Sequence, residues 1–109
     1  MALQLMAMGA QLVADDQTMI TVKDDWLIAT CPPETKGLIE ARGVGLLRAE
    51  AAESARLELA VDLSQRETER LPPFRTFSLL DHSLVLVLGQ DAPHFATSLR
   101  QYVLCGRHE

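Results

Sequence analysis

The chain has 109 residues, a formal net charge of −5 and a hydrophobic content of 48%. This is enough apolar material for one domain with a core, and the acidic balance argues against a general nucleic-acid binder, which needs a basic face to replace counterions. No apolar run reaches the roughly 20 residues of a membrane span, and the opening MALQLMAMGA lacks the basic start of a signal peptide, so we expect a cytoplasmic protein with no membrane association.

Helical and strand patterns alternate along the chain, which predicts an α/β fold with a mixed sheet, hairpins and a C-terminal helix. Runs of helix formers followed by glycine indicate helices, and alternating β-formers indicate strands. In the first part of the chain we expect a helix over residues 2–8, a short buried strand over 11–14, a hairpin over 18–23 and 26–30, and one helical turn over 34–37. An extended segment over 46–50 and a small-residue link over 49–55 then lead to a central strand over 57–63. The last part should contain a charged loop over 64–73, a hairpin over 76–80 and 83–88, and a helix after residue 91.

Local signals mark the ends of these elements. Asp24 and Asp25 predict the turn of the first hairpin, and the pair Asp81 and His82 predicts the turn of the second. Asp91 is the expected N-cap of the C-terminal helix, and a glycine follows the predicted end. The apolar stripe of this helix predicts a face packed on the core: Phe95, Leu99 and Tyr102 or Val103.

The stretch over residues 37–47, GLIEARGVGLL, combines opposite charges with glycines. Glu40 and Arg42 are two residues apart, so on an extended segment they project from the same face and suit a phosphate and metal site. Gly43 and Gly45 allow positive φ or a close approach of the backbone to a ligand. Neither glycine is followed by lysine and serine or threonine, so this is not a Walker A loop.

Two further charged segments are the pair Asp15 and Asp16 and the stretch over residues 64–73. Asp15 and Asp16 follow the predicted strand over 11–14, and ligands of α/β sheets bind at such strand ends. The alternative is that the aspartates only open a turn. The charged segment over 64–73 would ordinarily be a mobile, solvated connector.

The cysteines and histidines form no recognisable metal or redox pattern. Cys31 and Cys105 belong to no CxxC motif, so we expect reduced thiols. The histidines are scattered without metal-ligand spacing: His82, His94 and His108.

The segment GLIEARGVGLLR resembles the signature of the HPr kinase/phosphorylases, bacterial enzymes that phosphorylate a serine of the phosphocarrier protein HPr and can also remove that phosphate. LVADD, VDL, ETERLPP and PHFATSLRQYVL match in the order expected of the short proteobacterial members, so the resemblance covers nearly the whole chain. It implies a single catalytic domain over residues 1–109 with part of a P-loop kinase core, similar to phosphoenolpyruvate carboxykinase. It also implies ATP and Mg²⁺ as cofactors, HPr as protein partner and assembly into hexamers.

The resemblance further implies roles for individual residues. Asp15 would be the acid/base, with Asp16 supporting it by orientation or metal contact. Glu40 would be a magnesium ligand, and Arg42, with Gly43 and Gly45, would bind the cofactor. The arginine of the charged loop, Arg70, would handle phosphate, especially in the reverse reaction.

One departure from the family pattern concerns the phosphate-binding loop, which precedes the helix that matches residues 2–8. No G-x-x-x-x-G-K-S/T motif occurs in this sequence. We therefore expect a chain truncated before residue 1, inactive without its P-loop. The alternative is a non-catalytic remnant or fragment that binds a protein partner; a relative of phosphoenolpyruvate carboxykinase is a weaker alternative because the EARGVG context fits the protein kinase better.

Overall fold

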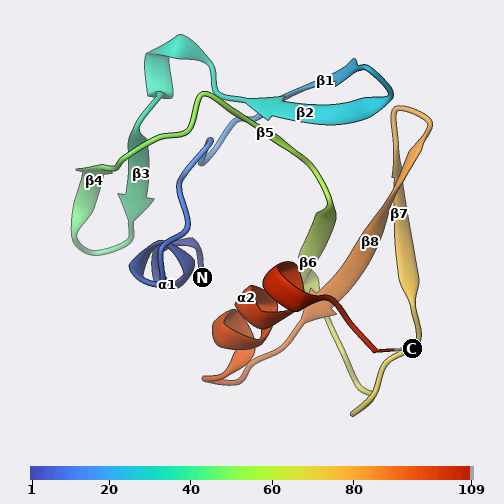
Figure 1. Ribbon diagram of the computed structural model, residues 1–109. Coiled ribbons are helices and arrows are strands. Elements are labelled where there is room, and N and C mark those ends of the chain that lie inside the picture. Colours follow the sequence, from blue (N-terminus) through green and yellow to red (C-terminus); the bar gives the residue numbers. More distant parts are fainter. Residues whose placement is uncertain (109) are drawn as a thin grey trace. The chain divides into compact units, whose positions relative to one another are not determined.

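The computed structural model describes residues 1–108, which divide into two compact units. The N-terminal unit contains mainly residues 6–57 and the C-terminal unit mainly residues 58–108, while the residues of helix α1 (Ala2–Ala7) are divided between the two. Helices and strands occur together, and parallel and antiparallel pairing coexist in one sheet (Figure 1). The predicted α/β class with a mixed sheet, hairpins and a C-terminal helix is confirmed.

The N-terminal unit contains two small antiparallel sheets. Strands β1 (Met19–Lys23), β2 (Trp26–Thr30) and β5 (Ser54–Arg56) form a 3-stranded sheet in the order β1-β2-β5. A 3-10 turn, η1 (Pro33–Thr35), leads into the 2-stranded hairpin of β3 (Leu38–Ala41) and β4 (Gly45–Arg48). Four of the buried apolar side chains of this unit lie on β2 and β3, and a fifth precedes β1 in sequence: Leu27, Ala29, Ile39 and Ala41, and Leu12.

The C-terminal unit contains a 3-stranded mixed sheet and a helix. The strands are β6 (Leu59–Arg66), β7 (Arg75–Leu79) and β8 (His82–Gly89), in the order β6-β8-β7. β6 runs parallel to β8, and β7 pairs with β8 as an antiparallel hairpin. Helix α2 (Phe95–Cys105) follows, and the buried side chains come from β8 and α2: Leu84, Leu88, Ala96 and Leu99.

The turns of the β1–β2 and β7–β8 hairpins have positive φ at their two central residues. Asp24 and Asp25 have φ of 52° and 65°, as the two-residue turn that suits strand twist requires, so the predicted first turn is confirmed. In the second hairpin the central residues are Leu80 and Asp81, with φ of 48° and 62°. The prediction of Asp81 and His82 was one residue late, because β8 already begins at His82.

Leu80→Asn is expected to raise the free energy of unfolding by about 1 kcal/mol, because leucine is strained at positive φ and asparagine is not. Little burial is lost, since Leu80 is 52% exposed. Urea unfolding of wild type and variant would measure the change. Leu71→Asn is the matched control, because Leu71 is also an exposed leucine but has no positive φ; an equal gain in both variants would contradict the strain argument.

Two strand predictions were wrong. Residues 11–14 form no strand, and Leu12 makes only an isolated bridge to Ala51, although its side chain is buried as predicted. β6 is not central to its sheet, because β8 pairs with a strand on each side and takes that place. Burial does not alternate along β6, where residues 59–62 are all half-buried.

The linking segments are more structured than predicted. The link over 49–55 contains the first two residues of β5, and the loop over 64–73 begins with the last residues of β6. The helical turn predicted over 34–37 is present as η1, which begins one residue earlier and ends two residues earlier. The segment predicted over 46–50 is strand only as far as Arg48, the last residue of β4.

Helix α2 begins later than its predicted cap. Asp91 is not the N-cap: that position is His94, with no side-chain cap bond, because residues 92–95 first form a turn in which the Phe95 amide donates to the Ala92 carbonyl at 3.1 Å. Gly106 ends the helix as predicted, with φ of 80° and its amide bonded to the Tyr102 carbonyl at 2.7 Å. On the apolar stripe, Leu99 is buried, whereas Val103 is exposed.

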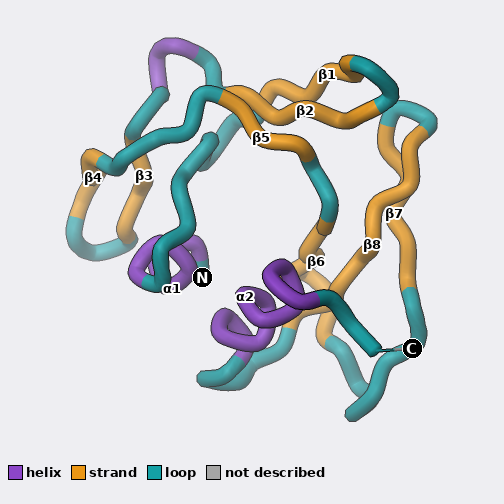
Figure 2. Tube along the Cα trace, viewed as in Figure 1, coloured by secondary structure: helices purple, strands orange, loops and turns teal. Residues whose placement is uncertain are grey.

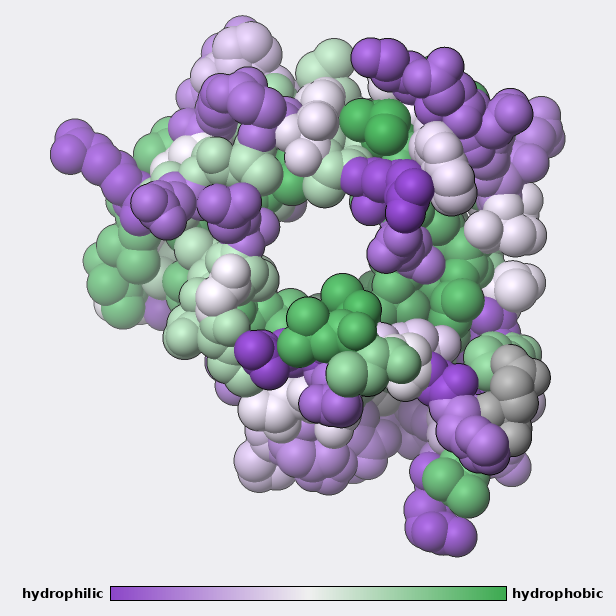
Figure 3. All heavy atoms as spheres, in the orientation of Figure 1, coloured by the Kyte–Doolittle hydropathy of each residue, from purple (hydrophilic) through white to green (hydrophobic). Residues whose placement is uncertain are grey.

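Hydrophobic residues reach the surface of both units among the hydrophilic ones, and several large side chains are more than half exposed (Figure 3). Among the described helices, none is long and apolar enough to cross a membrane. Both cysteines are free thiols, as predicted.

Candidate active site

A groove of about 650 Å³ lies within the N-terminal unit, around the β3–β4 hairpin. It collects every predicted site residue except Arg70. We call it the signature groove, and its lining residues are Asp15, Asp16, Thr35, Leu38, Glu40, Ala41, Arg42, Gly43, Val44, Gly45 and Leu46. Its volume falls within the range of small-molecule sites.

The turn between β3 and β4 forms one wall of the groove. The Val44 amide donates to the Ala41 carbonyl at 2.9 Å, and Gly43 and Gly45 have φ of 84° and 141°. A Cβ added to either glycine would meet no atom within 4 Å, so glycine is required here by the backbone conformation rather than by lack of space. The backbone at this turn is therefore open to a ligand.

Asp15 is held against β3 by a backbone hydrogen bond. Its Oδ2 accepts the amide of Glu40 at 2.9 Å, although the two residues are 25 positions apart in sequence. This contact joins the acidic pair to the signature segment and gives the carboxylate a defined orientation. Within the described chain, Oδ1 of Asp15 makes no hydrogen bond, so one oxygen stays available to a substrate.

The predicted shared strand face of Glu40 and Arg42 is wrong. Glu40 lies in β3, but the strand ends at Ala41 and Arg42 belongs to the turn, because the positive φ of Gly43 reverses the chain at once. Both side chains are exposed and both residues line the groove. Glu40 and Arg42 therefore line the same groove because the chain turns after Ala41, and not because they share one face of a strand.

The groove offers carboxylate oxygens for a cation, but not a complete protein cage. Asp15, Asp16 and Glu40 are all exposed. Within residues 1–108, no group of three or more His, Cys, Asp or Glu side chains is arranged to hold a metal ion. A site of this kind suits Mg²⁺, which usually takes one or two carboxylates and completes its shell with phosphate oxygens and water.

Arg70 lies in the C-terminal unit, between β6 and β7 in sequence. Figure 2 shows the chain that joins these two strands as a loop. The Arg70 side chain is exposed and makes no hydrogen bond or ion pair with any described residue. It lines a second groove, of about 490 Å³, whose other lining residues come from this loop, from β8 and α2, and from the residues that adjoin these two elements in sequence. The structure thus gathers the other predicted site residues in one unit and carries Arg70 in the other.

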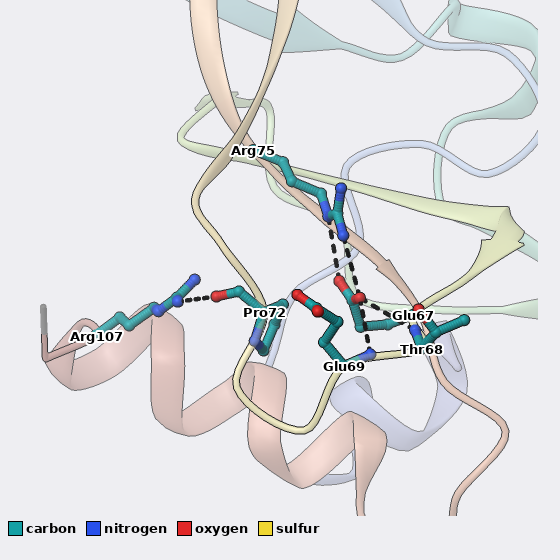
Figure 4. Close-up of polar contacts among 6 residues, drawn as sticks. All are labelled: Glu67, Thr68, Glu69, Pro72, Arg75 and Arg107. Carbon is teal, nitrogen blue, oxygen red and sulfur yellow. Dashed lines mark hydrogen bonds and ion pairs between the residues drawn. The ribbon is translucent and has the colours of Figure 1, made fainter.

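The sequence did not predict the bidentate ion pair between Glu67, at the start of this loop, and Arg75, the first residue of β7. Arg75 donates from Nε to Oε1 of Glu67 at 3.2 Å and from Nη2 to Oε2 at 3.1 Å (Figure 4). The Glu67 side chain is only 9% exposed, so the prediction of a solvated connector is wrong at this residue. In the sequence, the pair is visible only as two opposite charges on either side of a proline-containing loop. That pattern is too common to predict an ion pair.

The pKa of Glu67 is held below its ordinary value of 4.5, chiefly by the hydrogen bond from Arg75, while burial opposes the shift. A carboxyl with a lowered folded-state pKa stabilises the fold above pH 4.5, and this contribution is lost as the pH falls through the lower value. Asp62, whose pKa is lowered mainly by its bonds with Ser64, adds a similar acid dependence.

Glu67→Gln is therefore expected to reduce stability at pH 7, and the difference from wild type should shrink toward zero as the pH falls below 4.5. Urea midpoints between pH 3 and 7 would measure it. Glu69→Gln is the matched control, because its carboxylate interacts with Arg75 only weakly and through space. A difference that does not change with pH would show that Glu67 acts by packing alone.

No known family profile matches this chain. It is 36% identical to the HPr kinase/phosphorylase of Cupriavidus metallidurans and 35% identical to that of Cupriavidus necator, in each case over 100 residues that cover 82% of this chain and 29% of the relative. The chain thus spans less than a third of these relatives. The structure of the Hpr(Ser) kinase/phosphatase from Coxiella burnetii superposes with a TM-score of 0.78 at 21% identity, covering 94% of this chain and 74% of that one, and so has the same fold.

Proposed function

We propose that this chain is a member of the HPr kinase/phosphorylase family and that it carries the acid/base, metal-binding and phosphate-handling residues for transfer of a phosphoryl group between ATP and a serine of HPr, and for the reverse phosphorolysis. The observation that carries this proposal is the contact of Asp15 with the Glu40 amide inside a groove that also contains Asp16, Arg42 and the open glycine turn.

Asp15 is the proposed general acid/base. A serine hydroxyl is a weak nucleophile at neutral pH, so it benefits from a carboxylate that accepts its proton as the new oxygen–phosphorus bond forms and the bond to ADP breaks. Oδ1 of Asp15 suits this task, since Oδ2 accepts the Glu40 amide and Oδ1 bonds to no residue in the described part of the chain. In reverse, the protonated carboxyl returns the proton to the serine oxygen while inorganic phosphate attacks phosphoserine and forms pyrophosphate.

The other residues of the groove would bind rather than transfer protons. Glu40 and Asp16 fit Mg²⁺ because both are exposed carboxylates on the same cavity, and the bound ion would neutralise phosphate charge. Arg42 would contact phosphate oxygens or orient Glu40. Gly43 and Gly45 leave backbone open beside them. Arg70, whose guanidinium bonds to no described residue, would clamp the transferred phosphoryl group or the incoming phosphate.

These residues fit the metal and the reacting phosphate better than they fit the whole nucleotide. The glycines of the groove are not part of a Walker A loop, whose backbone amides and lysine would cradle the other phosphates. Binding of ATP therefore depends, in this proposal, on phosphate-binding groups other than those of the signature groove. By resemblance to the family we also propose a cytoplasmic hexamer that takes HPr as its protein substrate.

Calorimetric titration with Mg-ATP tests the proposal. The 109-residue chain would be titrated beside a longer version that includes any in-frame residues encoded upstream of Met1, and the longer version would then be assayed with HPr. Binding and HPr phosphorylation by the longer version alone is the expected result. Binding by the short chain would mean that the signature groove holds nucleotide without a P-loop. If neither version binds, the proposed activity is wrong and a protein-binding role takes its place.

A further inference from the structure

The loop that carries Arg70 joins β6 to β7, and both of its ends pair with β8, the strand between them. At its start, the amide of Glu67 donates to the carbonyl of Gly89 at the end of β8, at 2.9 Å. At its end, Arg75 opens β7 and pairs with Leu86 of β8. β8 lies between β6 and β7, so Glu67 and Arg75 stand on opposite sides of one strand. We call residues 67–75 the arginine loop.

The side chains of Glu67 and Arg75 close the base of this loop. Both carboxylate oxygens accept from the guanidinium, at 3.1 and 3.2 Å, which is the geometry of a strong and directional pair (Figure 4). Oε2 of Glu67 also accepts the amides of Thr68 and Glu69, at 3.1 and 3.2 Å. One carboxylate therefore orders the first residues of the loop and ties them to its last.

A further contact fastens the other side of the loop. The Arg107 guanidinium donates to the carbonyl of Pro72 and lies 4.1 Å from the centre of the Phe74 ring. Arg70 stands between these fixed points with an exposed side chain that no described residue engages. The loop is held by its neighbours on both sides, and its arginine is left free.

We propose that Glu67 and Arg75 are positioning residues that hold the arginine loop so that Arg70 meets the phosphoryl oxygens, an inference that rests on the phosphate-handling role proposed for Arg70. Neither residue of the pair is suited to touch the substrate itself. The carboxylate of Glu67 is 9% exposed and accepts four hydrogen bonds, and the guanidinium of Arg75 uses two nitrogens on it.

Such a pair would matter because the reaction rate falls when the arginine of the loop is displaced from the phosphoryl group. An arginine acts on a transferring phosphoryl group only when its donors lie where charge develops, and a shift of about 1 Å can cost up to about 100-fold in rate. A loop of this length without fastening would sample many positions. A rigid base restricts Arg70 without using Arg70 in the restraint.

A double-mutant cycle tests the proposal in the longer version of the protein that contains the upstream residues. Glu67→Ala is expected to lower kcat about tenfold in both directions, with little change in the KM for HPr. In an Arg70→Ala background the same substitution should have no further effect on kcat, because the group it positions is gone. A merely structural role would lower the rate by the same factor in both backgrounds.

Glu69→Ala is the matched control, since this carboxylate is exposed, belongs to the same loop and is expected to leave kcat unchanged. Amide exchange of Thr68 and Glu69 should quicken in Glu67→Ala and not in Arg70→Ala, because only Glu67 accepts their hydrogen bonds. Should Glu67→Ala fail to fold, Glu67→Gln would take its place in the cycle. This variant keeps one acceptor oxygen for the amides of Thr68 and Glu69 and loses the ion pair with Arg75.

The outcomes separate this inference from the proposed function. A large loss in Arg70→Ala with none in Glu67→Ala overturns the positioning role and leaves the proposed function intact. No loss in Arg70→Ala removes the role of the arginine and, with it, the role of the pair. Absence of phosphoryl transfer in the wild-type protein overturns both proposals, while the amide exchange still reports whether Glu67 fastens the loop.

Discussion

Asp15→Asn is expected to lower kcat for phosphorylation of HPr, and for the reverse phosphorolysis, by about 10²- to 10⁴-fold, the usual contribution of a general acid/base. Asparagine has the shape of aspartate, and its carbonyl oxygen can still accept the Glu40 amide that Asp15 accepts at 2.9 Å. The local structure should persist while the proton acceptor is lost. Steady-state kinetics of the longer version with Mg-ATP and HPr, and with phosphorylated HPr and inorganic phosphate, would measure the two rates.

Asp24→Asn is the matched control for this substitution. Asp24 lies in the β1–β2 turn at a φ of 52°, which asparagine tolerates, and it is outside the signature groove. Its rates should equal those of the wild type. A rise in KM with unchanged kcat in Asp15→Asn would indicate that Asp15 only binds substrate, and unchanged kcat/KM would remove it from the chemistry.

The parts of the fold that follow from neighbouring residues could be predicted from sequence. The β1–β2 hairpin follows from β-formers around Asp24 and Asp25, and the end of α2 follows from Gly106. The hairpin turn and the helix end each depend on the preference of one or two residues for a positive φ. The turn residues Gly43 and Gly45 belong to the same class, since their positive φ is a local property.

The parts that depend on distant partners could not be predicted in this way. Periodicity identifies β6 as a strand but does not say which strand pairs on each side, so the central place of β8 was missed. Leu12 is buried without belonging to a strand, because an apolar residue can fill a core from a loop.

The same limit applies to the candidate site. Residue spacing alone left Asp15 either as a turn residue or as a site residue, and the family resemblance linked it with the signature segment. Its contact with the Glu40 amide, 25 residues away, is a property of the folded chain. The pairing of Glu67 with Arg75 was likewise hidden in a stretch whose composition is typical of solvated loops.

Gly89→Val is expected to lower the free energy of unfolding by about 3 kcal/mol, near the upper end of the usual cost of overpacking. Gly89 is buried at the end of β8, opposite the irregular stretch of β6 between Asp62 and Arg66. A Cβ at this position would lie 3.1 Å from the Gln65 carbonyl oxygen and 3.3 Å from Cα of Leu63. Both contacts are with backbone, which cannot rotate away as a side chain can. Urea midpoints would measure the change.

The substitution should also loosen the arginine loop, which makes this prediction more specific than a loss of stability. The carbonyl of Gly89 accepts the Glu67 amide, so displacing β6 from β8 weakens the bond that starts the loop. Amide exchange at Glu67 should therefore quicken in the less severe Gly89→Ala under conditions where the protein remains folded. Ser83→Val is the control, because it adds a larger side chain to an exposed position of the same strand. If Gly89→Val unfolds at the same urea concentration as Ser83→Val, the close approach of β6 is not what requires glycine at this position.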